Sequence, residues 1–490
     1  MKDEGSILDP RPSARLSFFP VRCGTIGAMG NLFRAGLPYR ADSASLFEAV
    51  VDLPWAVFLD SGGHHLTQSR YDIIAAEPYA TLTTRGKLTE IRGDAIELSR
   101  EDPLVLLRQC LEFDPGSVCD LPFCGGAIGY FSYDLARRFE RLSARAEDSE
   151  KMPEMAIGIY DWAVVVDHLE RRSWLVGQGR DPETDWKWDR LIARFSVPAA
   201  ERARAPFRIT APLASNLSRD VYAAAFHRVH DYIHAGDCYQ INLAQRFAAP
   251  ATGDPWLAYQ ALRVINPAPY AAFLNTPYGT VMSASPERFL KLEGGQVETR
   301  PIKGTRPRAG HPRFDAELAA ELQASAKDRA ENVMIVDLLR NDLSKNCELG
   351  SVKVPKLFEV ESFATVHHLV STVTGRLRQG RDALDLLRGC FPGGSITGAP
   401  KLRAMQIIEE LEPHRRGIYC GAIGYIGGDG NMGLNIAIRT LVYSGGTVRF
   451  WAGGGIVADS RLEDEYQETF DKAAAMLRLL QQSAASQVGG

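Results

Sequence analysis

The chain has 490 residues, of which 45% are hydrophobic and 24% are charged, and its formal net charge is −4 at pH 7. These values are typical of a folded globular protein and exclude a fibrous or wholly disordered one. They also offer no basic surface for nucleic acid or an anionic membrane. No apolar run reaches the roughly 18 residues of a membrane span and no signal-peptide pattern opens the chain, so we expect a cytoplasmic protein.

The N-terminal part of the chain shows a short arm followed by a region of predicted strands. Residues 1–15 contain two prolines and mixed charges and predict a flexible arm. Residues 16–200 contain short apolar runs bounded by Gly, Pro and Asp, which predict β-sheet. The clearest of these runs are 55–59, 126–131 and 162–166.

A stretch that mixes proline, alanine and charge, 197–206, predicts a linker, and we place a sequence boundary at residue 201. The pentapeptide Gly-Ala-Ile-Gly-Tyr occurs at 126–130 and again at 421–425. The repeat indicates either two related halves of one architecture or a coincidence.

The region 201–490 alternates helical and strand-like patterns, which predicts an α+β (mixed α/β) fold. The expected helices are 219–235, 313–341, 400–411 and 461–482, and the strand-like runs include 271–274, 281–283 and 448–451.

The eight cysteines are dispersed without any Cys-x-x-Cys pair, which argues against a zinc site and against a disulfide-stapled scaffold. We therefore expect them to be reduced and mostly buried. No Gly-x-Cys-x-Gly glutaminase motif occurs either, so we do not expect the chain to release ammonia from glutamine itself.

One lysine stands out as a candidate nucleophile. Lys303 lies between Pro301 and Gly304, in a segment that also carries Arg300, Arg306 and Arg308. Like charges and partial burial both favour the neutral amine, which is the form that attacks carbon. The alternative is a basic turn on the surface.

Two pairs of carboxylates repeat one spacing on predicted helices. Asp328 and Glu331 share one helical face, as do Glu465 and Glu468. Two such helices can direct four carboxylates at one point, and oxygen ligands of this kind suit Mg²⁺. Each pair alone is equally consistent with solvated acids, and Glu468 is also spaced to form an ion pair with Lys472.

The segment 301–308, Pro-Ile-Lys-Gly-Thr-Arg-Pro-Arg, resembles the signature of the aminodeoxychorismate synthase component I family. The sister family, the anthranilate synthase large subunits, has alanine at the lysine position. Further segments resemble the chorismate-utilising enzymes in general, in the same order along about residues 220–475. They are 285–289, 327–342, 366–371, 398–401, 417–421 and 465–472.

The resemblance implies an anthranilate-synthase-like fold of two interlocked β-sheets with outer helices and a cleft between them. On that account the regions on either side of residue 201 form one structural body. It also implies that chorismate and ammonia are converted to 4-amino-4-deoxychorismate for para-aminobenzoate and folate synthesis. The expected cofactor is Mg²⁺, and the ammonia would come from a separate glutaminase subunit, component II.

The resemblance also implies roles for individual residues. Glu331 and Glu468 match the main metal ligands, with Asp328 and Glu465 in support. Lys303 would form a covalent intermediate, while Glu287 would protonate the leaving hydroxyl. The remaining positions matched to the substrate site are His368 beside the ring and Thr305, Tyr419, Gly421, Arg439, Gly453 and Lys472.

Two of these roles compete with simpler interpretations. Glu287 can instead form an ion pair with Arg288 or Arg300, which would lower its pKa and spoil an acid role. His368 can be a buried histidine of the core.

Segments 58–62, 69–72 and 266–270 resemble the part of these families that binds tryptophan, which gives Ser61, Tyr71, Pro269 and Tyr270 as candidate contacts. The inhibited members have Leu-Leu-Glu-Ser where this chain has Phe-Leu-Asp-Ser, so tryptophan binding and inhibition stay open. The competing functions are an anthranilate synthase component I and a non-catalytic tryptophan-binding regulatory subunit.

Overall fold

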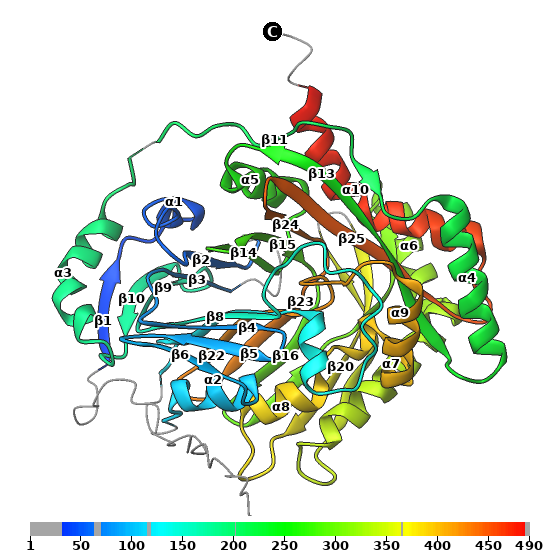
Figure 1. The fold of residues 1–490 in the computed structure, drawn as a ribbon, viewed down its shortest axis with the longest axis horizontal. Helices are drawn as coiled ribbons and strands as arrows, with labels where there is room; N and C mark the ends of the chain where they lie inside the picture. Colours follow the sequence, from blue (N-terminus) through cyan, green and yellow to red (C-terminus); the bar gives the residue numbers. More distant parts are fainter. Residues whose placement is uncertain (1–31, 63–69, 115–118, 201, 364–365, 486–490) are drawn as a thin grey trace, which may run out of the picture.

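The structure, a computed structural model, describes residues 32–62, 70–114, 119–200, 202–363 and 366–485. The arm predicted at 1–15 lies outside these residues. Two large β-sheets are packed together, with helices on their outer sides (Figure 1). This architecture confirms the predicted α+β fold with two sheets.

The first sheet contains thirteen strands within the described residues. Its main path runs β1 (Phe33–Leu37), β10 (Arg172–Gly177), β9 (Trp162–Asp167), β3 (Tyr71–Ala75), β2 (Val57–Asp60), β14 (Tyr270–Thr276), β15 (Gly279–Ser285), β24 (Thr440–Ser444), β25 (Thr447–Ile456), β13 (Gln240–Thr252) and β11 (Arg208–Ile209), and β12 (Ala214–Ser215) and β21 (Gly398–Ala399) also pair with β13.

The second sheet contains twelve strands in the same part of the chain. Its main path runs β18 (Ile302–Pro307), β20 (Val366–Arg376), β17 (Gln296–Thr299), β16 (Arg288–Glu293), β23 (Met432–Ile436), β22 (Ala422–Gly427), β7 (Gly126–Phe131), β8 (Met155–Tyr160), β4 (Ala80–Arg85), β5 (Leu88–Arg92) and β6 (Ile96–Ser99), and β19 (Lys353–Ser362) also pairs with β20.

Both sheets are built from strands on either side of residue 201. In the first sheet β2 pairs with β14, and in the second β7 pairs with β22. The two sequence regions therefore share one pair of sheets, because each sheet needs strands from both regions to be continuous.

The repeated pentapeptide forms two neighbouring strands of the second sheet. β7 and β22 are antiparallel, with Gly129 opposite Gly424. A Cβ atom at Gly424 would lie 2.0 Å from the carbonyl oxygen of Gly433, and one at Gly129 would lie 2.1 Å from that of Ala156. Close contact with neighbouring strands thus requires glycine at both positions, which gives the repeat a physical reason.

The core between the sheets follows from the pattern of β9. Ala163 and Val165 lie in the cluster that strands of both sheets share, whereas Trp162, Val164 and Val166 face the helices outside the first sheet. Both faces of this strand are buried, which explains why its sequence is continuously apolar and does not alternate.

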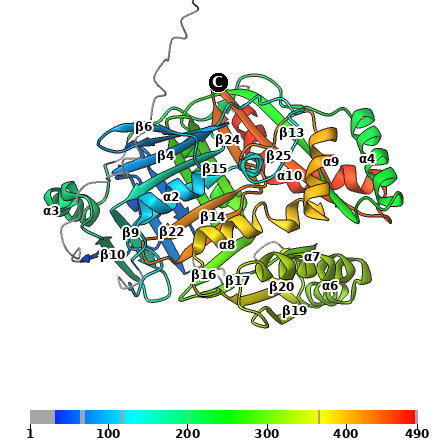
Figure 2. The same cartoon turned by 60° about the horizontal axis from the view of Figure 1, so that its bottom comes forward.

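The helices lie outside the sheets (Figures 1 and 2). Three of them begin with an Asp-Pro pair in which Asp102, Asp181 or Asp254 caps the first backbone N–H groups. The helices are α1 (Ala44–Phe47), α2 (Pro103–Leu111), α3 (Pro182–Ser196), α4 (Arg219–His234), α5 (Pro255–Ile265), α6 (Pro312–Ala324), α7 (Ala326–Ser344), α8 (Ala383–Cys390), α9 (Lys401–Leu411) and α10 (Leu462–Ala485), with 3₁₀ turns η1 (Tyr133–Arg138) and η2 (Gly394–Ile396).

The single helix expected at 313–341 is in fact two helices. Ser325 separates α6 from α7 with an extended backbone, and its side chain accepts a hydrogen bond from the N–H of Asp328. A serine cap of this kind starts a new helix, so the sequence pattern missed a capping signal. The break matters for the site because α7 then lies against β18 and β20.

The expectation of reduced cysteines is wrong for one pair. Cys119 and Cys124 form a disulfide in the loop that precedes β7, where the chain brings their Cα atoms to 6.5 Å. The other cysteines in the described ranges are free and buried. Within those ranges, no helix is both long and apolar enough to cross a membrane.

Candidate active site

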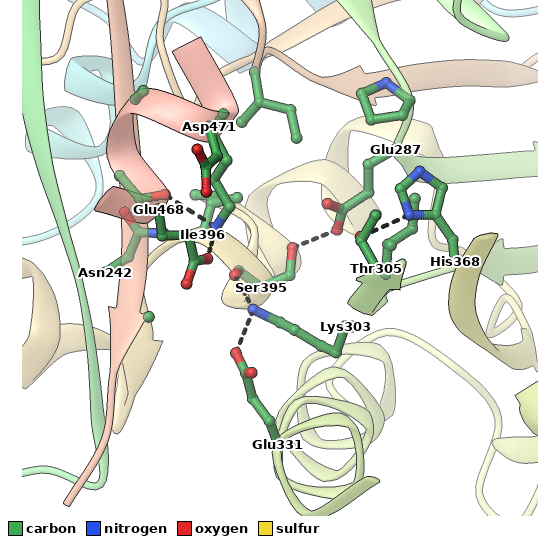
Figure 3. Close-up of a pocket in the computed structure, with 18 of the residues that line it drawn as sticks. Asn242, Glu287, Lys303, Thr305, Glu331, His368, Ser395, Ile396, Glu468 and Asp471 are labelled. Carbon is green, nitrogen blue, oxygen red and sulfur yellow. Dashed lines mark hydrogen bonds and ion pairs between the residues drawn. The ribbon is translucent and has the colours of Figure 1, made fainter. Parts of the chain in front are cut away.

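A cleft of about 960 Å³ lies where β18, α7, η2, β25 and α10 meet (Figure 3). Of the residues predicted to act on a substrate or bind a metal, the cleft is lined by all except Gly421. Those lining it are Glu287, Lys303, Thr305, Asp328, Glu331, His368, Tyr419, Arg439, Gly453, Glu465, Glu468 and Lys472.

Lys303 reaches into the cleft from β18. Its Nζ atom donates to the carbonyl oxygen of Ser395 at 3.0 Å and forms an ion pair with Glu331 at 3.0 Å. Its side chain is 12% exposed. The alternative of a basic surface turn is therefore wrong for this residue.

The expected lowering of the Lys303 pKa is also wrong. Burial alone would lower this pKa, but the negative charge of Glu331 beside the amine opposes burial, and the pKa of Lys303 lies above its usual value. The three neighbouring arginines do not crowd it, because each is paired with an acid. Arg300 pairs with Glu361, Arg306 with Glu321 and Asp328, and Arg308 with Asp315.

The surroundings of Glu287 favour its protonated form. Burial raises the pKa of Glu287 and outweighs both the hydrogen bond from Ser395 and the charge of Lys303. The Oγ atom of Ser395 donates to its Oε1 atom at 2.6 Å. The competing ion pairs do not form, because Arg288 pairs with Glu298 and Arg300 with Glu361.

Carboxylates from α7 and α10 converge on two glycines of β25. A Cβ atom at Gly454 would lie 2.8 Å from Oε2 of Glu465 and 3.5 Å from Oε1 of Glu468. A Cβ atom at Gly455 would lie 3.2 Å from Oε1 of Glu331. A Cβ atom at Gly455 would also lie 2.0 Å from Nε2 of Gln240, so glycine at both positions lets these side chains approach β25 closely. Their carboxylate oxygens are ligands that a hard cation such as Mg²⁺ prefers.

Glu465 supports this interpretation. Its Oε1 atom accepts a hydrogen bond from Ser460 at 2.6 Å, whereas Oε2 is buried with no hydrogen-bond partner in the described structure. Burial raises the pKa of Glu465. A buried carboxylate oxygen without a partner is unfavourable and fits a group that binds a cation.

The other acids are engaged by cations of the protein. Glu468 pairs with Lys472 at 2.5 Å, as its spacing allowed, and Asp328 pairs with Arg306 at 3.2 Å. Burial favours the protonated form of Glu331, but the charge of Lys303 holds the pKa of Glu331 below its usual value. In the ranges described, no three acidic, histidine or cysteine side chains lie close enough together to hold a metal as they stand.

The far side of the cleft presents groups suited to carboxylates. Arg439 donates to Asn266 at 3.3 Å, and Lys472 donates to the carbonyl of Gly453 at 3.1 Å. The ring of Tyr419 stacks on that of Trp451 with 6.1 Å between centroids. An arginine, a lysine and a phenol can pair with an anionic ligand.

Gly421 is the exception among the predicted contacts. Its N–H donates to the carbonyl of Ile418 at 2.9 Å, and a Cβ atom there would lie 2.2 Å from the carbonyl oxygen of Phe131. The glycine is thus needed for close packing beside β7, and its N–H is already used.

His368 and Thr305 form a pair across β18 and β20. The Oγ1 atom of Thr305 lies 2.9 Å from Nδ1 of His368, and burial lowers the pKa of His368 to about 3. The imidazole is therefore neutral at physiological pH. It is buried, as a core histidine would be, and it also lines the cleft.

Three residues at the cleft or directly behind it were missed by the sequence analysis. Gln240 donates to Glu331 at 2.9 Å, Ser395 contacts Lys303 and Glu287, and Asn242 lines the wall. Buried oxygen atoms of Gln240 and Asn242 have no hydrogen-bond partner within the described structure. Amides and single serines carry no spacing signal, but Ser395 lies just before the recognised segment 398–401.

A second cavity of about 380 Å³ lies between the sheets and is lined by all four candidate tryptophan contacts, Ser61, Tyr71, Pro269 and Tyr270. These residues come from segments far apart in the sequence. The structure thus brings the predicted set together at one pocket.

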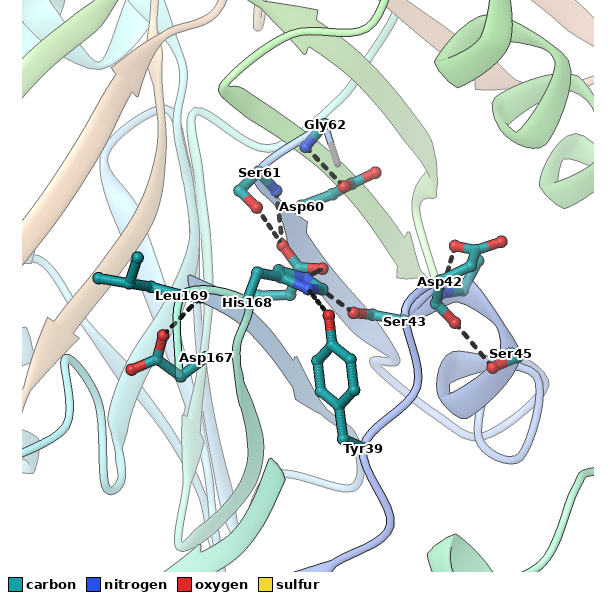
Figure 4. Close-up of polar contacts among 12 residues, drawn as sticks. Tyr39, Asp42, Ser43, Ser45, Asp60, Ser61, Gly62, Asp167, His168 and Leu169 are labelled. Carbon is teal, nitrogen blue, oxygen red and sulfur yellow. Dashed lines mark hydrogen bonds and ion pairs between the residues drawn. The ribbon is translucent and has the colours of Figure 1, made fainter. Parts of the chain in front are cut away.

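A buried hydrogen-bond network stands behind Ser61 (Figure 4). Asp72 accepts from both the N–H and the hydroxyl of Ser61, at 2.7 and 2.6 Å, and pairs with His168 at 2.8 Å. The hydroxyls of Tyr39 and Ser43 lie 3.2 and 3.3 Å from the ring nitrogens of His168. Burial lowers the pKa of His168, but Asp72 outweighs it, and the net shift is upward.

Asp60 forms the neighbouring part of this network. It accepts from Arg263 at 2.5 Å, from the hydroxyl of Tyr259 at 3.0 Å and from the N–H of Gly62 at 2.9 Å. Both oxygens of this buried acid are therefore satisfied.

The cleft combines a buried lysine, a buried acid whose pKa is raised, carboxylates from two helices and side chains that can bind an anion. This set defines an enzyme that acts on a small anionic substrate. The sequence matches the family of chorismate binding enzymes over residues 56–478, and the chain belongs to that family.

Individual relatives agree with this assignment. Aminodeoxychorismate synthase component 1 of Klebsiella aerogenes is 50% identical over 450 residues, which cover 91% of this chain and 98% of that protein. The protein of the same name from Escherichia coli (strain K12) is 48% identical over 463 residues, which cover 91% and 98%. The crystal structure of anthranilate synthase component I from Streptococcus pneumoniae TIGR4 matches with a TM-score of 0.76 at 34% identity, covering 83% of this chain and 92% of that one.

Proposed function

We propose that this chain is the chorismate-converting component of an aminodeoxychorismate synthase. It would combine chorismate with ammonia to form 4-amino-4-deoxychorismate, with Lys303 as a covalent nucleophile and Glu287 as the general acid. The observation that carries the proposal is Lys303 itself, which is buried in the cleft where the anthranilate-forming sister family has alanine. Relatives at 50% and 48% identity carry the same functional name.

The chemistry assigned to the two residues is complementary. The amine attacks a ring carbon and the C4 hydroxyl leaves with the proton of Glu287, after which ammonia displaces the lysine. Lys303 must first lose a proton, since Glu331 holds it as an ammonium in the free cleft. Arg439 and Lys472 are the proposed partners of the substrate carboxylates.

Mg²⁺ is the proposed cofactor. Glu331 and Glu468 would hold it, with Glu465 and Asp328 beside them, and it would neutralise one carboxylate of the substrate. The approach of Glu331, Glu465 and Glu468 to Gly454 and Gly455 and the buried, unpartnered oxygen of Glu465 support this assignment.

The ammonia would come from a separate glutaminase subunit. The relatives are named as component 1, and the chain has no glutaminase motif of its own. We propose that this subunit docks and delivers ammonia to the cleft, and that ammonium salts replace it in vitro.

Product analysis tests the function. The purified chain with chorismate, Mg²⁺ and an ammonium salt should form 4-amino-4-deoxychorismate and release no pyruvate. Anthranilate with pyruvate would overturn the proposal in favour of the sister reaction, and the absence of any turnover would favour a non-catalytic subunit. Lys303→Ala should remove the adduct that acid quenching traps on the wild-type chain, and an adduct on the variant would exclude the lysine as nucleophile.

We further propose that the second cavity binds tryptophan. It gathers the four candidate contacts, and Tyr71 and Tyr270 supply aromatic surface beside the polar groups of Ser61. Isothermal titration calorimetry with tryptophan tests this proposal, and no heat of binding at millimolar tryptophan would exclude it.

A further inference from the structure

Ser395 lies between the two groups that the proposed reaction uses (Figure 3). Its carbonyl oxygen accepts a hydrogen bond from Nζ of Lys303 at 3.0 Å, and its hydroxyl donates to Oε1 of Glu287 at 2.6 Å. The residue is 7% exposed. One buried residue thus contacts the nucleophile with its backbone and the acid with its side chain.

We propose that Ser395 is a positioning residue that orients the amine of Lys303 and the carboxyl of Glu287 toward the same substrate molecule. The inference rests on the proposed function, because it assigns Ser395 a role only through those two groups. Reacting groups need alignment to within a fraction of an ångström. One rigid residue that contacts both groups can fix their relative positions.

The segment that carries Ser395 is suited to this task because it is tightly packed. A Cβ atom at Gly393 would lie 2.6 Å from the side chain of Ile436, and one at Gly394 would lie 2.6 Å from that of Leu338. The turn η2 is therefore pressed against β23 and α7. The hydroxyl of Thr397 donates to the carbonyl of Gly393 at 3.1 Å and holds the turn from within.

A different serine, Ser285, holds the backbone of Glu287. The hydroxyl of Ser285 donates to the carbonyl of Ile436 at 2.6 Å, and the N–H of Glu287 donates to that hydroxyl at 3.2 Å. These contacts hold the backbone of Glu287 but not its carboxyl group. The orientation of the carboxyl depends on the hydroxyl of Ser395.

The role predicts a change in the pH profile with a definite sign. A hydrogen bond from Ser395 stabilises the charged form of Glu287 and so lowers its pKa. Without that hydroxyl the pKa of Glu287 rises further. Since the acid must be protonated to act, the loss of kcat at alkaline pH should move to higher pH, while kcat at the optimum falls because the carboxyl is no longer oriented.

The test compares Ser395→Thr with Ser395→Val in the wild-type assay with chorismate, Mg²⁺ and ammonium. The two side chains have the same shape and differ only in the hydroxyl. We expect the Val variant to lose about 10- to 100-fold in kcat relative to the Thr variant, with a smaller change in KM and an alkaline limb at higher pH. Ser344→Ala is the control, because it removes a hydroxyl that bonds to the carbonyl of Asn341 at the exposed end of α7 and does not line the cleft.

Equal kcat and equal pH profiles for the Thr and Val variants would overturn the role of Ser395 in an enzyme that is otherwise active. The same kcat loss and pH shift in Ser344→Ala would also overturn it, since the effect would then not be specific to Ser395. A wild-type chain that forms no 4-amino-4-deoxychorismate would refute the proposed function instead. In that case ¹³C NMR titration of the Glu287 carboxyl, assigned with Glu287→Gln, still decides whether the hydroxyl of Ser395 sets its pKa.

Discussion

The candidate active-site cleft and the network behind the second cavity both contain buried acids beside cations. The two regions differ in how completely the oxygen atoms of their buried polar groups are hydrogen-bonded. In the cleft, Glu465 and Asn242 keep buried oxygen atoms without a hydrogen-bond partner in the described structure. In the network, Asp72 bonds to Ser61 and His168 through both of its oxygens.

This difference indicates what each region is built for. A satisfied buried network is rigid and stabilises one arrangement, whereas unpartnered buried oxygens are unfavourable until a ligand supplies the missing contacts. The cleft therefore has the polarity of a site that binds and reacts, and the network has that of a support for the pocket wall at Ser61. Substitutions should consequently affect activity in the cleft and stability in the network.

The largest expected effect is on catalysis. Glu287→Gln keeps the size of the side chain but removes the proton donor, and kcat should fall by about 10²- to 10⁴-fold. Steady-state kinetics of product formation measure it. Glu317→Gln, a change at an exposed acid on α6, is the control. A kcat within twofold of the wild type for Glu287→Gln would exclude Glu287 as the general acid.

The second-largest expected effect is on stability, and it should differ between the cleft and the network. Asp72→Ala leaves His168 and Ser61 without their buried partner and should lower the free energy of unfolding by about 3–5 kcal/mol. Glu465→Gln removes a buried charge with an unpartnered oxygen and should leave that free energy unchanged or higher. Urea unfolding compares the two, and equal destabilisation would contradict the distinction between the regions.

A weaker effect depends on pH. Asp72 raises the pKa of His168 in the folded state, so the protonated histidine stabilises the fold fully below its unfolded pKa of about 6.5. That contribution is lost as the pH rises through the folded pKa. His168→Gln should thus be most destabilised relative to the wild type near pH 6, by about 1–3 kcal/mol, and less so at alkaline pH. A difference that grows with pH would contradict the assigned charge.

The sequence predicted the contents of the cleft better than its electrostatics. Spacing on helices and strands placed Asp328, Glu331, Glu465 and Glu468 on two faces, and the structure brings those faces to one cleft. The pKa shift of Lys303 was predicted with the wrong sign, because the nearest charge in space is Glu331 and the nearest charges in sequence are arginines. Separation along the sequence does not show which charged groups lie closest to a side chain in the folded protein.

The fold shows the same limit. The apolar runs at 126–131 and 162–166 predicted β7 and β9, since strands buried on both faces are continuously apolar. The break between α6 and α7 at Ser325 was missed because the helical pattern continues across it. The contacts of Ser395 and of the Asp72 network join residues that are far apart in the sequence. No local sequence pattern indicates which distant residues will meet.

The smallest effect concerns the second cavity. The hydroxyl of Ser61 lies at the cavity wall and is held by Asp72, so Ser61→Ala should loosen that wall and weaken tryptophan binding by about 1 kcal/mol, a five- to tenfold rise in Kd. Calorimetry measures this change, with Ser45→Ala as the control, since its hydroxyl bonds only to the carbonyl of Asp42. An unchanged Kd in Ser61→Ala would mean that the network supports the fold alone. A raised Kd would show that the rigid region of the molecule also shapes a binding site, because the buried pair of Asp72 and His168 holds the cavity wall at Ser61 in place.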